Sequence, residues 1–156
     1  LLTADESGNL THAAVDISTT VEEQADYLAR QAQRRDAVTY CGKRDGRVVA
    51  LAALHTPEAP RIAHTSEVSL LVAQHCWGQG IGSEMMKALL GFARRCGTLR
   101  LLYLGARGGN EAAFSLYRKF GFQNTGHLPG YFCIDGVPHD LVQMALVLTP
   151  GNMPND

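Results

Sequence analysis

A glycine-rich turn between an apolar run and an amphipathic segment is the part of this sequence best suited to chemistry. Residues 68–72 are almost all apolar, residues 77–83 read Trp-Gly-Gln-Gly-Ile-Gly-Ser, and a helical pattern follows. The N-terminus of a helix offers unpaired N–H groups and a partial positive charge, and glycines let a backbone approach a phosphate closely. We therefore expect this turn to bind a phosphate group, and a diphosphate is its natural ligand.

The glycine spacing limits which phosphate compound fits the turn. It reads G-x-G-x-G and departs from the dinucleotide pattern G-x-G-x-x-G, because Ser83 takes the sixth position. No Gly-Lys-Ser/Thr follows, so the nucleoside-triphosphate loop is excluded as well. Glycines before a helix are weakly specific on their own, and a tight turn without a ligand is the structural alternative.

Two segments together resemble the motifs of the GNAT acetyltransferases. Residues 77–82 are similar to their motif A, Q/R-x-x-G-x-G/A, and residues 110–122 are similar to motif B, N-x-x-A-x-x-L-Y-x-x-x-G-F. One predicted helix and one predicted strand separate the motifs, as in that family. The segment from Gly130 to Asp140, followed by Met144, resembles a bacterial subgroup that includes phosphinothricin-type and L-amino-acid N-acetyltransferases. The resemblance covers about residues 64–148 and departs from the motif at Trp77, where Gln or Arg is usual.

The resemblance implies that acetyl-CoA lies against the glycine-rich turn and the strand before it. The backbone of residues 70–72 would pair with the pantetheine arm as an added strand, and the N–H of Val72 would stabilise the oxyanion. Residues 79–83 would hold the diphosphate, and Asn110 would bond the arm while it caps its own helix. The expected cofactor contacts are Leu70, Leu71, Val72, Trp77, Gly78, Gln79, Gly80, Ile81, Gly82, Ser83, Asn110, Ala113 and Tyr117. Because Trp77 replaces Gln or Arg, one side-chain contact to the phosphates is expected to be lost.

Tyr117 is the expected general acid for the departing thiolate. A thiol has a pKa of about 8.5 and tyrosine one of about 10, so proton donation by Tyr117 is mildly uphill and assistance is plausible. Helical periodicity alone would equally make Tyr117 a core aromatic. Its place in the second motif favours the acid role.

The acceptor amine needs a base, because a free amine with a pKa near 10 is mostly protonated at pH 7. Glu67, on the strand that leads to the cofactor, is the first candidate, with an exposed strand carboxylate as the structural alternative. His64 and His139 are further candidates. Asp140 either orients the amine or stabilises a turn, and Tyr131 lines the acceptor pocket or belongs to the core. His64, Tyr131 and Asp140 are thus the expected acceptor contacts.

Composition excludes several classes of function. Apolar residues make up 46% of the 156 residues and charged residues 19%. The net charge is −1, and acidic and basic residues are mixed along the chain. We therefore expect neither nucleic acid nor a membrane as partner, and no apolar run reaches the length of a membrane span. No signal peptide is evident, and the four widely spaced cysteines predict free thiols in the reducing cytoplasm. No His, Cys or Asp cluster has metal spacing, so no metal is expected.

Local signals predict the elements that position these residues. Thr20 and Glu23 form a capping-box pattern, so a helix should run to about Arg35. Asp45-Gly46 predicts a hairpin between strands at 37–41 and 47–55. The remaining expected elements are strands at about 62–72, 99–104, 122–128 and 139–148, and helices at 81–96 and from Asn110 to Gly121.

This order of elements predicts a single α/β domain over residues 1–156, with a flexible tail at 150–156. The resemblance implies the GNAT fold: a mixed, mostly antiparallel sheet that splays between two central strands, with helices on both faces. The first strand and helix of that fold are not evident before Thr20, and we expect them to be missing or to lie upstream of Leu1.

The function implied is transfer of an acetyl group from acetyl-CoA directly to a primary amine, such as a small molecule or an amino acid, in a ternary complex. The alternatives are acetylation of a protein N-terminus or lysine, and a non-catalytic module that senses acyl-CoA. A nucleotide-binding domain is disfavoured by the glycine spacing. A homodimer is a further expectation from the family.

Overall fold

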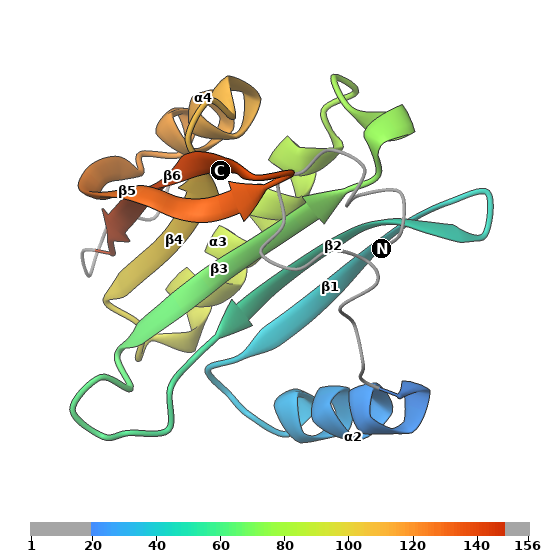
Figure 1. Ribbon diagram of the computed structural model, residues 1–156. Helices are drawn as coiled ribbons and strands as arrows, with labels where there is room; N and C mark the ends of the chain where they lie inside the picture. The colour runs from blue at the N-terminus through green and yellow to red at the C-terminus, as the bar shows by residue number, and fades with distance from the viewer. Residues whose placement is uncertain (1–19, 149–156) are drawn as a thin grey trace.

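The computed structural model describes residues 20–148, which form a six-stranded sheet and three helices (Figure 1). The N-terminal residues 1–19 and the predicted tail at 150–156 lie outside the described residues. The elements are α2 (Val21–Ala32), β1 (Val38–Arg44), β2 (Arg47–His55), β3 (Thr65–Val72), the 3-10 turn η2 (Gln74–Cys76), α3 (Ile81–Cys96), β4 (Leu101–Arg107), α4 (Glu111–Lys119), β5 (Gln123–Ile134) and β6 (Val137–Val147).

The sheet has the strand order β1-β2-β3-β4-β6-β5. Every neighbouring pair is antiparallel except β3 and β4, which run parallel. The predicted mixed, mostly antiparallel sheet is therefore confirmed.

The two central strands pair over only three residues. Residues 65, 66 and 67 of β3 pair with 101, 102 and 103 of β4, and pairing stops at Glu67 and Tyr103. Both strands continue, β3 to Val72 and β4 to Arg107, without further pairing to each other. The predicted splay thus begins immediately after Glu67, and it leaves two strand edges without their usual partners.

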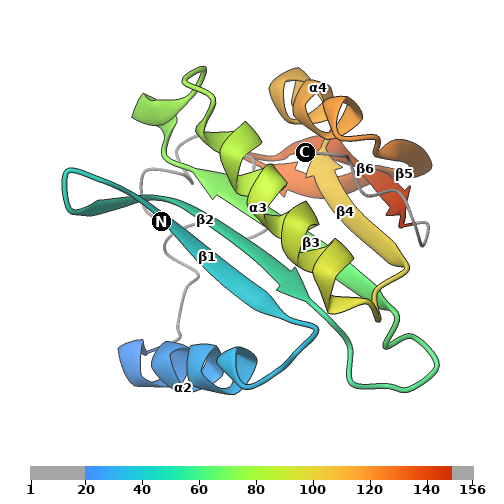
Figure 2. The same ribbon diagram turned by 180° about the vertical axis from the view of Figure 1, so that it is seen from behind.

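Helices cover both faces of the sheet. Alternate residues of a strand point to opposite faces, and on one face the buried residues pack under α3 and α4. Figure 2 shows α3 in front of β3 on this face, and α3 packs against β1, β2 and β3. The residues of this core with the lowest exposure include Leu54, Met86, Leu89, Leu99, Leu102, Phe122 and Met144. On the opposite face α2 packs against β1, and the hydroxyl of Tyr27 lies 2.8 Å from Nδ1 of His55.

The local sequence signals account for the ends of most elements. Thr20 and Glu23 form both hydrogen bonds of the capping box, although α2 ends at Ala32, before the predicted Arg35. The strand expected from residue 62 begins at Thr65, because Thr65 donates from both its amide and its hydroxyl to the carbonyl of Ile62 and so closes a turn.

Two hairpin turns have the same Asp-Gly signature, and sequence analysis used only the first. Asp45 and Gly46 have φ values of 49° and 76°, and Asp135 and Gly136 have 50° and 76°. Positive φ at both central residues suits the right-handed twist of a hairpin. The second turn makes the last two strands a continuous hairpin, so β5 extends to Ile134, well beyond the predicted residue 128.

Candidate functional site

The glycine turn, defined as residues 77–83, presents a series of unused backbone donors. Gly78 and Gly80 have φ values of 70° and 81°, and Gly80 is the N-cap of α3 with no side-chain cap. The first hydrogen bond that enters α3 runs from the amide of Glu84 to the carbonyl of Gly80 (3.1 Å). Within residues 20–148, the six amides of residues 78–83 have no protein acceptor. This arrangement suits an anion.

Side-chain bonds fix the turn without using those amides. The indole N–H of Trp77 donates to the carbonyl of Val72 (2.7 Å), and Nε2 of Gln79 donates to the carbonyl of His75 (3.0 Å). A Cβ at Gly82 would lie 3.1 Å from Cδ2 of Leu116, so glycine lets α3 and α4 approach at this point. The side chains of Trp77 and Gln79 thus anchor the turn to carbonyls that precede it, and its backbone amides stay available.

The edge of β3 that faces the splay also carries free donors. The amide of Ala73 donates to the carbonyl of Val49 in β2 (2.8 Å). Hydrogen bonding alternates along an antiparallel strand, so Leu71 also bonds to β2 and the amides of Leu70 and Val72 point toward β4. Since β4 no longer pairs there, these two amides face the gap. Of residues 70–72, Leu70 and Val72 thus have amides available to the expected pantetheine arm, whereas the amide of Leu71 is directed to β2.

Tyr117 lies in α4 with its ring in the core and its hydroxyl without a protein partner. The ring packs against Phe122 at a centroid distance of 6.0 Å, and the residue is 8% exposed. Burial raises the pKa of Tyr117 to about 12. Its hydroxyl makes no hydrogen bond to residues 20–148 and is not sealed from solvent, so at neutral pH it is a protonated donor open to a ligand.

At the start of α4, Oδ1 of Asn110 accepts from the amide of Ala113 (3.2 Å), so the predicted cap is confirmed.

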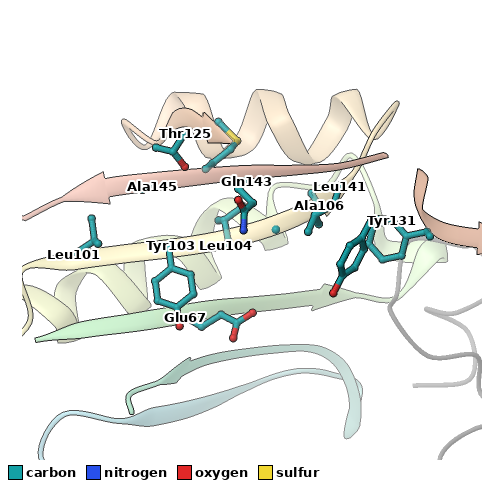
Figure 3. A pocket seen from close by; sticks show the side chains of 13 residues that line it. Glu67, Leu101, Tyr103, Leu104, Ala106, Thr125, Tyr131, Leu141, Gln143 and Ala145 are labelled. Carbon is teal, nitrogen blue, oxygen red and sulfur yellow. The ribbon is translucent and has the colours of Figure 1, made fainter. Parts of the chain in front are cut away.

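A cavity of about 620 Å³ opens on the face of the sheet opposite α3 and α4. Glu67, the last paired residue of β3, projects into it beside Tyr103, with Tyr131 further along (Figure 3). Burial and the charge of Glu67 raise the pKa of Tyr103. Glu67 is the one charged side chain in the described lining, which otherwise consists of Leu101, Tyr103, Leu104, Gly105, Ala106, Thr125, Tyr131, Phe132, Leu141, Gln143, Met144 and Ala145.

Asp140 lies outside the cavity lining and organises the β5 bulge. Its Oδ1 accepts from the amide of Gly130 (2.9 Å) and its Oδ2 lies 2.7 Å from Nε2 of His127. The hydrogen bond from Gly130, followed by that from His127, lowers the pKa of Asp140. Pairing between β5 and β6 is interrupted between residues 128 and 132. Of the two roles considered for Asp140, the geometry favours stabilising a turn.

The two histidines considered as bases are also outside the cavity lining. His64 precedes β3, at the end far from the glycine turn, and its carbonyl accepts from the amides of Arg100 and Leu101. His139 lies 3.5 Å through Nδ1 from Nη1 of Arg107.

Sequence analysis missed several lining residues, among them Tyr103, Thr125 and Gln143. A signal existed for Tyr103, because it interrupts an apolar run at a position that must face away from Leu102 and Leu104. Gln143 has no comparable signal, since its place beside Gly105 depends on the β4–β6 register.

Three further features bear on the class of protein. No helix within residues 20–148 is long and apolar enough to cross a membrane. None of the four cysteines is in a disulfide. In the same described range, no three His, Cys, Asp or Glu side chains are grouped as metal ligands would be.

Comparison with known proteins gives consistent matches. The model of the acetyltransferase (GNAT) family matches residues 9–122. YwnH of Bacillus subtilis, named as a phosphinothricin acetyltransferase, is 34% identical over 82 residues, which is 53% of this chain and 50% of YwnH. The chain spans about half the length of that relative. A GNAT-family acetyltransferase from Streptococcus pneumoniae superposes with a TM-score of 0.90 at 24% identity, covering 94% of this chain and 88% of its own. The protein yncA from Salmonella typhimurium, solved with acetyl-CoA, superposes with a TM-score of 0.80 at 24% identity. The match covers 98% of this chain and 86% of yncA.

Proposed function

The chain belongs to the acetyltransferase (GNAT) family, and we propose that it transfers the acetyl group of acetyl-CoA directly to a primary amine, with both substrates bound at once. The observation that carries the proposal is the row of free amides at residues 78–83, next to an unpaired strand edge that ends at Val72. The similar fold of yncA, which was solved with acetyl-CoA, supports the choice of donor.

The free backbone donors account for how acetyl-CoA would be held. The amides of residues 78–83 suit the diphosphate, and the amide of Leu70 suits the pantetheine arm. The amide of Val72 is the remaining donor on that edge, so it is the group available to stabilise negative charge on the carbonyl oxygen of the acetyl group. Acetyl-CoA supplies a thioester-activated acetyl group, and the chain supplies binding and orientation.

Tyr117 is proposed to assist the departure of the thiolate. With a pKa of about 12, its hydroxyl carries a proton at any physiological pH, but full donation to a thiolate whose thiol has a pKa of about 8.5 is uphill. A thiolate in the same desolvated site would also be more basic than in water. Donation of a hydrogen bond, with transfer late in the step, is the role that this environment supports.

Glu67 is proposed to accept the proton of the attacking amine, directly or through water. Its carboxylate stands where β3 and β4 separate, so it lies between the cavity and the splay. The cavity is therefore proposed to hold the acceptor. Its apolar residues and the side chains of Tyr103, Tyr131 and Gln143 suit a small amine with an apolar body.

We also propose a cellular location and an oligomeric state. The unpaired cysteines agree with a reducing, cytoplasmic location, and a homodimer remains a prediction.

Release of free thiol from acetyl-CoA, measured against a panel of amines, tests the proposal. The panel should contain amino acids, aliphatic and aromatic monoamines, polyamines, and peptides with a free N-terminus or lysine. Turnover with small amines supports it, and turnover restricted to peptides favours the protein-acetylating alternative. Tight acetyl-CoA binding with no turnover on any amine would instead identify a sensing module.

A further inference from the structure

A side chain from the β1–β2 hairpin reaches into the glycine turn. Arg44 is the last residue of β1, and its Nη1 donates a hydrogen bond to Oε1 of Gln79. The same nitrogen lies 3.9 Å from the buried thiol of Cys76. Because Gln79 is itself bonded to the carbonyl of His75 (3.0 Å), the guanidinium of Arg44 is tied to the turn at a defined place.

Within the described chain, the guanidinium of Arg44 has N–H groups that are not hydrogen-bonded and a charge that no carboxylate neutralises. A guanidinium has five N–H donors, and both contacts of Arg44 use Nη1, so its Nε and Nη2 have no acceptor within residues 20–148. No carboxylate of the described chain forms an ion pair with Arg44. Glu84, the acidic residue in the first turn of α3, pairs with Lys87 (2.7 Å). A cation without a carboxylate partner in residues 20–148 thus lies against the turn that carries six unbonded amides, and both features favour an anion.

The turn has no cationic side chain of its own for the phosphates. Trp77 stands at the motif position where Gln or Arg is usual, and its indole N–H is already bonded to Val72. We propose that Arg44, supplied by the neighbouring hairpin, makes the side-chain contact to the diphosphate of CoA that residue 77 does not make. This inference rests on the proposed function, and it assigns Arg44 to cofactor binding and not to the chemical step.

Calorimetric titration of CoA into wild type, Arg44→Gln and Lys43→Gln tests the assignment. Lys43 is a matched control, because it loses the same charge from the same hairpin, while strand alternation directs it to the opposite face. Loss of a charge-assisted hydrogen bond predicts about tenfold weaker binding for Arg44→Gln, and Lys43→Gln should bind as wild type does. Arg44→Lys should be intermediate, because it keeps a cation but not the planar fork.

A second ligand identifies the phosphate group. With 3′-dephospho-CoA, which retains the diphosphate, Arg44→Gln should show the same loss as with CoA. A loss that disappears with this ligand would assign Arg44 to the 3′-phosphate and overturn the proposal. The difference between wild type and Arg44→Gln should also shrink as salt is raised, because exposed charges are screened; a purely structural defect would not respond in this way.

The outcomes separate this inference from the proposed function. Equal CoA affinity in wild type and Arg44→Gln, with wild type binding well, overturns the role of Arg44 and leaves the acetyltransferase proposal intact. Failure of wild type to bind CoA overturns both. Circular dichroism checks that each variant is folded, and if Arg44→Gln is not, the affinity of Arg44→Lys decides: wild-type affinity with both ligands would count against the contact.

Discussion

Replacing Tyr117 by phenylalanine separates the chemistry of its hydroxyl from the packing of its ring. The hydroxyl has no hydrogen-bond partner in the described chain, and the ring would keep its place against Phe122. We therefore expect the free energy of unfolding at pH 7 to change by less than about 0.5 kcal/mol. If the hydroxyl assists the leaving thiolate, kcat should fall by about 10²-fold, which corresponds to about 2.7 kcal/mol, and the KM for acetyl-CoA should change little.

The same substitution should change how stability depends on alkaline pH. Burial raises the pKa of Tyr117 from 10.0 to about 12, so the unfolded chain ionises at a lower pH than the folded protein. The stabilising contribution is complete below pH 10 and is lost as the pH rises through 12. The pKa difference is about 2, and each pKa unit corresponds to about 1.36 kcal/mol, so the free energy of unfolding of the wild type should fall by about 2.7 kcal/mol. Tyr117→Phe should not show this fall.

Steady-state kinetics and urea unfolding between pH 7 and 11 measure both effects. Tyr40→Phe is a suitable control, because Tyr40 lies in β1, half-buried and outside the cavity lining. A kcat for Tyr117→Phe within about threefold of wild type, well short of a normal acid–base contribution, would remove the hydroxyl from the mechanism. Unfolding curves for wild type and variant that stay parallel up to pH 11 would contradict the raised pKa.

Three other predictions follow from the site. If Glu67 is the base, Glu67→Gln should lower kcat by about 10²-fold and flatten the acidic limb of the pH–rate profile; an unchanged profile would exclude Glu67. Gly80→Glu should abolish acetyl-CoA binding in titrations, whereas Gly97→Glu, at the other end of α3 with a similar φ of 72° against 81°, should bind normally; equal losses would indicate backbone strain alone. Asp140→Asn should lower the melting temperature at pH 7. Since Gly130 and His127 lower the pKa of Asp140, the gap to wild type should close as the pH falls below the ordinary value of 3.8, and a constant gap would argue against this account.

Sequence predicted best those features that depend on neighbouring residues. The Thr20–Glu23 capping box, the Asp45–Gly46 turn and the start of α3 after Gly80 were all confirmed, since each is a bond or a φ value set within a few residues. The missed extension of β5 to Ile134 was equally local, because the Asp135–Gly136 turn carries the same signature. The splay after Glu67 required the family resemblance, because no local pattern shows where two paired strands separate.

The cavity beside Glu67 could not be predicted because it depends on register between strands that are distant in sequence. Glu67, Tyr103 and Gln143 come from β3, β4 and β6, and they share a face only through the order β3-β4-β6. The contact between Arg44 and Gln79 joins residues that are 35 positions apart. Such neighbours follow from how the sheet is assembled, and the sequence of either segment alone contains no sign of the other.

The bond between the indole of Trp77 and the carbonyl of Val72 has a consequence for molecular selection at the end of β3. A bare strand edge displays acceptors as well as donors, so it could attract amines and carbonyl compounds alike. With this terminal oxygen occupied by the protein's own ring, the tip of the strand presents its amide alone. On the proposed function, the thioester carbonyl would find a donor at this point, and the oxygen beside that donor would have less acceptor capacity left for a protonated amine.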